Sequence, residues 1–229
     1  MALTFQDIKG EFLDLVNGDS TCQKYQALSA AGKATYRDAS LYAVRVGDLL
    51  GRVLKRHAPV LDISEWDLEK LIPQALGLNH AMVSEMCGKV QNTMNEDAGL
   101  GIRAVSPGFD RSRAYGIVEE LRSNPAFVNI EKTFYDQLTN FTQNVVDESV
   151  RENAELQSRA GIKSYVIRTA EYNACEWCQA VEGTYDYQDV KGKGNDVWRR
   201  HENCRCTIDY VSERGTERVN NYKRYTPRR

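Results

Sequence analysis

Gly161-Ile162-Lys163-Ser164-Tyr165-Val166-Ile167-Arg168-Thr169 is the stretch that decides the fold class. Before it, apolar residues recur every three or four positions, the spacing that places them on one face of a helix. Within it, Tyr165, Val166 and Ile167 stand together, and aromatic and β-branched residues of this kind favour strands. Glycine commonly ends a helix, so Gly161 marks the change. The sequence predicts an α+β fold, in which a mostly helical N-terminal portion precedes a small α+β domain with short antiparallel strands.

A series of amphipathic helices is predicted upstream of this stretch. The first opens at Thr4 with Asp7 three positions later, which resembles a capping box. Pro73 lacks the amide proton of an interior turn and is expected to end or bend its helix. Residues 98–108 hold three glycines and one proline and are expected to form a loop. The expected helical ranges are 4–16, 36–57, 64–73, 80–94, 110–121 and 127–157, and the expected strand segments are 165–167, 184–187 and 207–211.

Length and composition narrow the class of protein. The chain has 229 residues, 41% of them hydrophobic, and 30 basic against 32 acidic residues give a net charge of −2. Such a chain can bury a core, and the balance of charge disfavours a dedicated nucleic-acid binder. No run approaches the roughly 20 apolar residues that span a bilayer, and the first residues lack the pattern of a secretory signal. We therefore expect a soluble protein with no membrane partner, made in a cytosol.

Four of the six cysteines cluster after the deciding stretch. Cys175-Glu176-Trp177-Cys178 is followed, after 22 intervening residues, by His201-Glu202-Asn203-Cys204-Arg205-Cys206. A Cys-x-x-Cys turn can direct two sulfurs at one ion, and His201-x-x-Cys204 has the same gap, so it can form the second knuckle of a tetrahedral site. The sequence therefore predicts a structural zinc site, with disulfides or buried free thiols as the alternatives.

Five candidate donors compete for the four positions of that site. In an extended segment Cys204 and Cys206 point to the same side and Arg205 to the opposite side, so either sulfur can be the fourth ligand. The isolated cysteines, Cys22 and Cys87, are interpreted as small core residues. His57 ends a basic helix and His80 lies on an apolar helix face, so both are interpreted as structural. The predicted metal ligands are Cys175, Cys178, His201, Cys204 and Cys206.

The same residues resemble a known family. The order Ile167-Arg168-Thr169, Cys175-x-x-Cys178, Gly183-Thr184-Tyr185, and His201-x-x-Cys204-Arg205-Cys206-Thr207 is similar to the C-terminal domain of the Mu F-like phage head-morphogenesis (minor capsid) proteins. The similarity covers about residues 160–211, roughly a quarter of the chain. The residue after the histidine is often proline in that family and is Glu202 here, at a tolerant turn position.

The resemblance implies a virion protein rather than an enzyme. It implies a structural interaction protein with a structural Zn²⁺, made in the bacterial cytoplasm and located at the portal vertex inside the phage head. The implied partners are the portal protein, the capsid protein or both, with a role in head morphogenesis and in DNA packaging or ejection. An arginine recurs before the first knuckle of the family and corresponds here to Arg168. We expect its guanidinium to brace the knuckle.

The resemblance and the patterns together divide the chain into three parts. Residues 1–158 are expected to form a helical portion for docking and assembly, with its own core. Residues 159–211 are expected to form the Mu F-like zinc-knuckle domain, and residues 212–229 a basic flexible tail. The stripe formed by Val46, Leu50 and Val53 is expected either to dock on a partner or to form the helical core.

Two other functions compete with this one. A zinc-ribbon nucleic-acid adaptor would use the basic tail, in which Tyr222 and Tyr225 can stack on bases, although such a tail can equally be a solvated terminus. A zinc hydrolase would leave one position to water, with Glu176 or Glu202 as the base, but several thiolates disfavour it. The cations that could contact DNA or a partner are Arg214, Arg218, Lys223, Arg224, Arg228 and Arg229.

Overall fold

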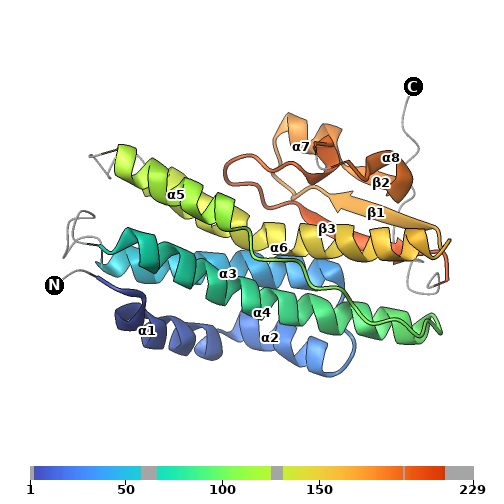
Figure 1. Cartoon of the computed structure of the whole chain (residues 1–229), viewed down its shortest axis with the longest axis horizontal. Coiled ribbons are helices and arrows are strands. Elements are labelled where there is room, and N and C mark those ends of the chain that lie inside the picture. The colour runs from blue at the N-terminus through green and yellow to red at the C-terminus, as the bar shows by residue number, and fades with distance from the viewer. Residues whose placement is uncertain (1–2, 58–65, 125–130, 193, 215–229) are drawn as a thin grey trace.

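The computed structural model confirms the α+β fold class. It describes residues 3–57, 66–124, 131–192 and 194–214. Figure 1 shows long helices along the long axis of the molecule, with α1 and α2 at one side and a small sheet at the opposite side. The helices of this part are α1 (Phe5–Gly18), α2 (Ser20–Ala30), α3 (Tyr36–His57), α4 (Leu68–Asp97), α5 (Arg111–Ser123) and α6 (Glu131–Arg159).

The capping signals act as predicted, whereas Pro73 does not end its helix. Thr4 and Asp7 form a complete capping box at the start of α1. Pro73 lies inside α4, which continues from Leu68 to Asp97, so the two helices expected on either side of it are one. Pro73 stands in the second turn of α4, where a missing amide removes only the bond to the carbonyl of Glu69. That carbonyl belongs to an exposed residue, so water can replace the lost bond.

Helices α3 and α6 approach each other closely because α3 has glycines at the contact. A Cβ added at Gly47 would lie 2.7 Å from Cα of Thr139, and one added at Gly51 would lie 3.3 Å from the ring of Tyr135. At this contact the hydroxyl of Thr139 in α6 donates to Asp48 Oδ1 of α3 at 3.0 Å. Glycine at these two positions therefore lets α3 and α6 pack with their backbones close together.

The end of α6 and the start of the sheet follow the predicted pattern. Gly161 adopts a φ of +75°, and the amide of Ile162 donates to the carbonyl of Gln157 at 3.0 Å, which closes the helix. The next strand, β1, is central in an antiparallel sheet of order β2-β1-β3. The elements of this part are β1 (Ser164–Thr169), α7 (Glu176–Ala180), β2 (Gly183–Asp186), α8 (Tyr187–Val190), η3 (Asp196–Trp198) and β3 (Thr207–Ser212).

The sheet and the helices share one hydrophobic core, so the expectation of a separate helical core is wrong. Tyr210 of β3 and Tyr36 of α3 pack edge to face with ring centres 6.2 Å apart. Ile208 and Val166 are fully buried in the same cluster as the helix residues. A three-stranded sheet this small cannot cover its own apolar face, so it takes α3 and α6 as its second layer.

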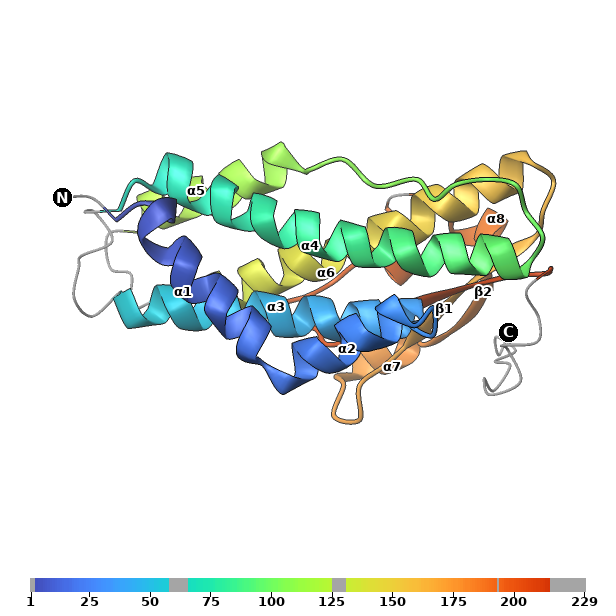
Figure 2. The ribbon, with the colours of Figure 1, turned by 90° about the horizontal axis from the view of Figure 1, so that it is seen from below.

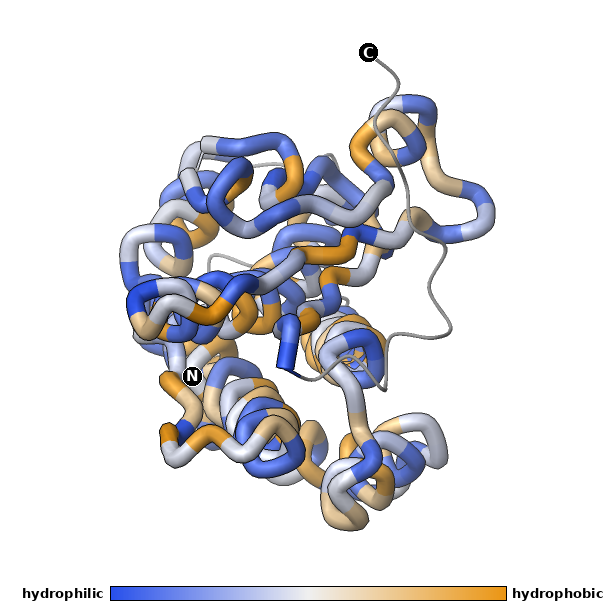
Figure 3. Tube along the Cα trace, turned by 90° about the vertical axis from the view of Figure 1, so that its right-hand side faces the viewer, coloured by the Kyte–Doolittle hydropathy of each residue, from blue (hydrophilic) through white to orange (hydrophobic). Residues whose placement is uncertain are grey.

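The amphipathic helices face this core. Figure 3 shows hydrophobic and hydrophilic residues alternating along the helical traces, and Figure 2 shows the long helices side by side. Val46, Leu50 and Val53 are fully buried, so of the two roles expected for this stripe the core role is the observed one. Cys22 and Cys87 are buried in the same core, as predicted.

The two isolated histidines have structural neighbours. His57 Nε2 lies 3.2 Å from a carboxylate oxygen of Glu11, and His80 Nε2 lies 3.0 Å from the carbonyl oxygen of Pro107.

Within the described residues, none of the helices has the length and apolar character needed to span a membrane.

Candidate metal centre

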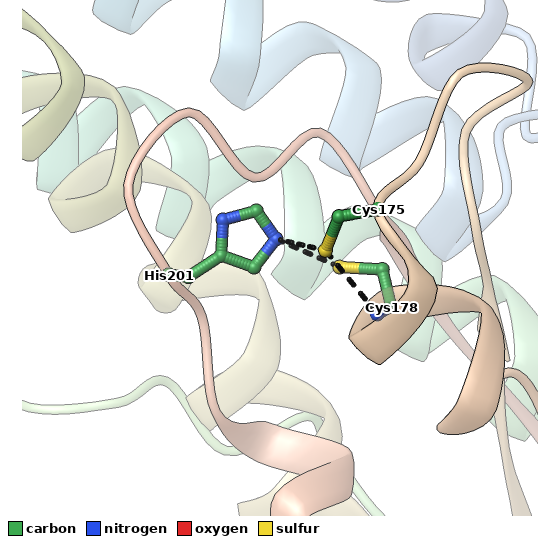
Figure 4. A group of neighbouring side chains, drawn as sticks. All are labelled: Cys175, Cys178 and His201. Carbon is green, nitrogen blue, oxygen red and sulfur yellow. Dashed lines mark hydrogen bonds between the residues drawn. The ribbon is translucent and has the colours of Figure 1, made fainter.

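The two cysteine motifs meet at one point. Cys175 is the N-cap of α7 and Cys178 lies within that helix, so one short turn presents both sulfurs in the same direction. His201 and Cys204 come from the segment between η3 and β3, and strand pairing of β1 with β3 returns this segment to α7. Figure 4 shows the ring of His201 facing Cys175 and Cys178. The fold therefore unites donors that are more than twenty residues apart.

The distances between donors suit a small ion. His201 Nε2 lies 3.3 Å from Cys175 Sγ and 3.0 Å from Cys178 Sγ. Cys178 Sγ lies 3.9 Å from Cys204 Sγ, close to the edge of about 3.8 Å in a tetrahedron with metal–sulfur bonds of about 2.3 Å. The donors form two groups that share Cys178, and within each group all the ligand atoms lie within 4.8 Å of one another. One group is Cys175, Cys178 and His201, and the other is Cys178, Cys204 and Cys206.

The segment around Cys204 has the predicted alternation. Cys204 and Cys206 are both buried beside Cys178, whereas Arg205 points to α3 and donates to Asp48 Oδ1 at 2.9 Å. All six cysteines are free thiols, so the disulfide alternative is not adopted. The five predicted donors can together bind a metal ion.

His201 has the orientation of a metal-binding imidazole. Its Nδ1 lies 2.5 Å from the carbonyl oxygen of Glu202, which leaves Nε2 free to face the sulfurs. Its ring also meets Trp177 edge to face, with ring centres 5.8 Å apart. The peptide carbonyl of the same turn and the neighbouring indole thus set the direction of the ring.

Arg168 lies at the centre of the two knuckles. It is 1% exposed, and its guanidinium donates to the carbonyls of Val197 at 2.7 Å and Arg199 at 2.8 Å. Its other terminal nitrogen lies 3.8 Å from Cys178 Sγ and 3.7 Å from Cys204 Sγ. The guanidinium also packs over the ring of Trp177 at 5.2 Å. These contacts join the strand before the first knuckle to the segment that carries the second.

A second buried arginine connects the site to the helical bundle, and the sequence did not single it out. Arg200 and Asp147 of α6 form an ion pair with 3% and 2% of their side chains exposed, through contacts of 2.6 and 2.8 Å. Arg200 also donates to the carbonyl of Cys206 at 2.7 Å, and Asn140 of α6 donates to the carbonyl of His201 at 2.9 Å. The only sequence signal for this contact was an acidic residue, Asp147, directly after the apolar pair Val145 and Val146 of the predicted helix.

The buried thiols differ in their electrostatic environment. A hydrogen bond from Cys206 together with the charges of Arg200 and Arg168 lowers the pKa of the Cys204 thiol, against the effect of burial. The hydrogen bond to Cys204 and burial raise the pKa of the Cys206 thiol. Burial also raises the pKa of Cys178. Cys204 is therefore the buried sulfur most readily present as a thiolate, the form that binds metals.

Three residues of the expected tail, 212–214, belong to the described structure, and Ser212 is the buried last residue of β3 rather than the start of the tail. Arg214 follows β3, is exposed, and its amide donates to the Ser212 hydroxyl at 3.2 Å. The other predicted contact residues, which are Arg218, Lys223, Arg224, Arg228 and Arg229, lie outside the described residues.

Comparison of the chain with protein-family models, curated proteins and solved structures finds no match in any of the three.

Proposed function

We propose that the chain is a structural protein of phage head assembly whose C-terminal part is held by a zinc ion. The motif order from Arg168 to Cys206 supports the Mu F-like assignment, and the convergence of the five donors supports the metal. The proposed site of action is the portal vertex inside the head, with portal or capsid protein as the partner. Catalysis has no part in this proposal.

A single observation carries the metal assignment. Arg168 is a fully buried cation, and within the described residues its hydrogen bonds go to peptide carbonyls and two cysteine sulfurs, with no carboxylate partner. A buried charge without a counter-ion is strongly unfavourable. Thiolates at Cys178 and Cys204 would supply the missing negative charge, and a metal keeps thiols deprotonated at neutral pH.

The donor set favours zinc among the common metals. Thiolates and a neutral imidazole suit Zn²⁺, whereas Mg²⁺ and Ca²⁺ prefer oxygen ligands. When bound, the ion would cross-link α7 to the segment before β3 and would stabilise the fold of both. Cys175, Cys178, His201, Cys204 and Cys206 are the residues that could hold it, and Arg168 and Arg200 would brace them.

The helical portion supplies the surface for assembly in this proposal. Its apolar stripes are already buried, so docking on a ring-shaped partner would use the polar outer faces of the helices, with the basic tail available for DNA or partner contact. The charge of residues 1–150, which hold 15 basic and 20 acidic residues, is −5 and favours a partner surface with basic groups.

The metal is tested by Cys178→Ser, since Cys178 belongs to both donor groups. Purified reduced protein should contain about one zinc per chain, and the variant should lose it. Cys22→Ala changes a buried cysteine in the helical core and should leave the zinc content unchanged. Wild-type protein that contains no zinc after reconstitution under reducing conditions would refute the metal site.

The assembly role is tested by co-expression with the portal and capsid proteins of the phage of origin. The chain should enter heads and should co-purify with the portal. Protein that binds zinc, stays out of heads and binds DNA with a steep dependence on salt would instead favour the nucleic-acid adaptor.

A further inference from the structure

A polar cleft between α3 and α6 lies outside the candidate metal centre. Its volume is about 230 Å³, and its lining comes from α3, α6 and Arg205. Gly51 lines it without a side chain, so the ring of Tyr135 and the helix backbone form part of the wall. Pockets for drug-sized molecules have volumes of about 300–1,000 Å³. The cleft therefore suits one inserted side chain better than a free small molecule.

Most of the charges around the cleft are compensated by neighbours. Asp48 Oδ1 accepts hydrogen bonds from the Thr139 hydroxyl at 3.0 Å and from Arg205 Nη1 at 2.9 Å. Lys55 Nζ lies 3.0 Å from a carboxylate oxygen of Glu131. Two other charged side chains of the lining are not compensated in this way.

The first of these is Arg52 of α3. Its side chain is exposed and has no ion-pair or hydrogen-bond partner among the described residues. Arg205 uses Nη1 for Asp48, and its other N–H groups make no hydrogen bond within the same residues. A planar guanidinium fork matches the two oxygens of a carboxylate, so two such groups on one cleft favour an anion.

The second is Asp136 of α6. Its Oδ2 is buried and accepts no hydrogen bond in the part of the chain that the structure describes. Burial raises the pKa of this carboxyl more than the charges of Arg205 and Lys132 lower it. A buried oxygen without a donor is costly, so an N–H from outside the chain would stabilise it. The cleft thus has a place for an anion and a place for a hydrogen-bond donor.

An acidic residue of a polypeptide offers both groups, since it has a side-chain carboxylate and a main-chain N–H. A phosphate of the DNA backbone brings no donor, and a lysine or arginine would meet Arg52, Lys55 and Arg205 with like charge. We propose that the cleft binds an aspartate or glutamate of a partner protein, with its carboxylate at Arg52 and Arg205 and its main-chain N–H at Asp136 Oδ2. This inference depends neither on the metal nor on the role in head assembly.

The carboxylate is tested by titrating the full-length chain with acetyl-Gly-Glu-Gly-amide and following backbone and arginine side-chain N–H signals by NMR. Saturable shifts at the cleft are expected, with millimolar affinity because the contacts are few. Acetyl-Gly-Gln-Gly-amide should bind at least about tenfold more weakly, since it lacks the charge. Arg52→Gln should weaken binding of the glutamate peptide by about threefold to tenfold. Arg37→Gln is the matched control, because Arg37 is also exposed on α3 and lies outside the cleft lining.

The main-chain donor is tested with propionate, which presents the same carboxylate without an N–H. The wild-type chain should bind the peptide more tightly than propionate, and Asp136→Ala should reduce this preference by about threefold or more. Equal binding of the glutamate and glutamine peptides, or unchanged binding in Arg52→Gln, would overturn the proposal. Tighter binding of inorganic phosphate than of the peptide, unaffected by Asp136→Ala, would instead assign the cleft to phosphate groups.

Discussion

At the scale of single residues, a buried guanidinium carries most of the organisation of the metal centre. Arg168 is the central-strand residue paired with Gly183 on one side and Ile208 on the other, so the sheet determines its position. From there its side chain contacts the carbonyls of Val197, within η3, and Arg199, directly after it, and two cysteine sulfurs. An arginine fork can serve several acceptors in a plane, which a lysine ammonium cannot do from the same position.

Arg168→Lys should therefore retain the fold and weaken the metal site. We expect zinc affinity to fall by about tenfold to a hundredfold, the range typical of outer-shell changes at metal sites, together with a lower melting temperature. Arg199→Lys is the control, since Arg199 forms an exposed pair with Asp196 and lies next to the same segment. Chelator competition and thermal melting measure both effects, and an unchanged zinc affinity in Arg168→Lys would contradict the bracing role.

At the scale of elements, the close approach of α3 and α6 depends on a backbone without a side chain. Gly47 lies against the backbone of Thr139, so the two helices would have to separate to admit a methyl group. This contact also positions Asp48 of α3 where Thr139 and Arg205 both reach it. The helix pair and the second knuckle are thus joined through one carboxylate.

Gly47→Ala should destabilise the protein although alanine favours helices. Overpacking a close contact typically costs about 1–3 kcal/mol, which exceeds the helix-propensity gain of about 1 kcal/mol. Gly116→Ala in α5 is the matched control, since its added methyl group meets nothing within 4 Å, and it should stabilise the chain by up to about 1 kcal/mol. Urea denaturation measures both, and a Gly47→Ala variant as stable as Gly116→Ala would show that the helices have room to move.

At the scale of the whole molecule, the two hydrophobic clusters do not follow the division of the chain into a helical portion and a C-terminal domain. The strands belong to the helical core, whereas Cys178, Cys204 and Cys206 form a separate small cluster with Ala170, Ala174 and Trp177 around it. The candidate metal centre is thus a small unit on a larger folded body. Its connections to that body are polar, mainly the Arg200–Asp147 pair and the Asn140 contact.

Removal of the metal should accordingly open the knuckles and leave the sheet in place. Hydrogen exchange after chelation should rise over residues 174–180 and 200–206, because a site this small depends on its ion for stability. Exchange over β1 and β3 should remain slow, since their apolar residues are buried against α3 and α6. Loss of protection in both strands would show instead that the metal stabilises the sheet as well as the knuckles.

Local signals in the sequence were sufficient for most of the long helices, for the three strands and for the choice of candidate donors, but they missed α2 and the short helices α7 and α8. Periodicity predicted the helices, Gly161 predicted the change to strands, and the spacing of Cys175, Cys178, His201 and Cys204 predicted a metal site, because each signal lies within one turn or one short motif. Pro73 does not end its helix, because the cost of its missing amide depends on how exposed the unpaired carbonyl is, which a sequence does not state.

Only the tertiary structure decided how these parts combine. The shared core of sheet and helices, the buried pair of Arg200 with Asp147, and the contact of Gly47 with Thr139 all join residues far apart in the chain. Such contacts depend on which helix faces meet and at what distance, and no local pattern contains that information. The sequence determined most of the local elements and the residue types that could hold a metal, and packing determined which charges and candidate donors lie together.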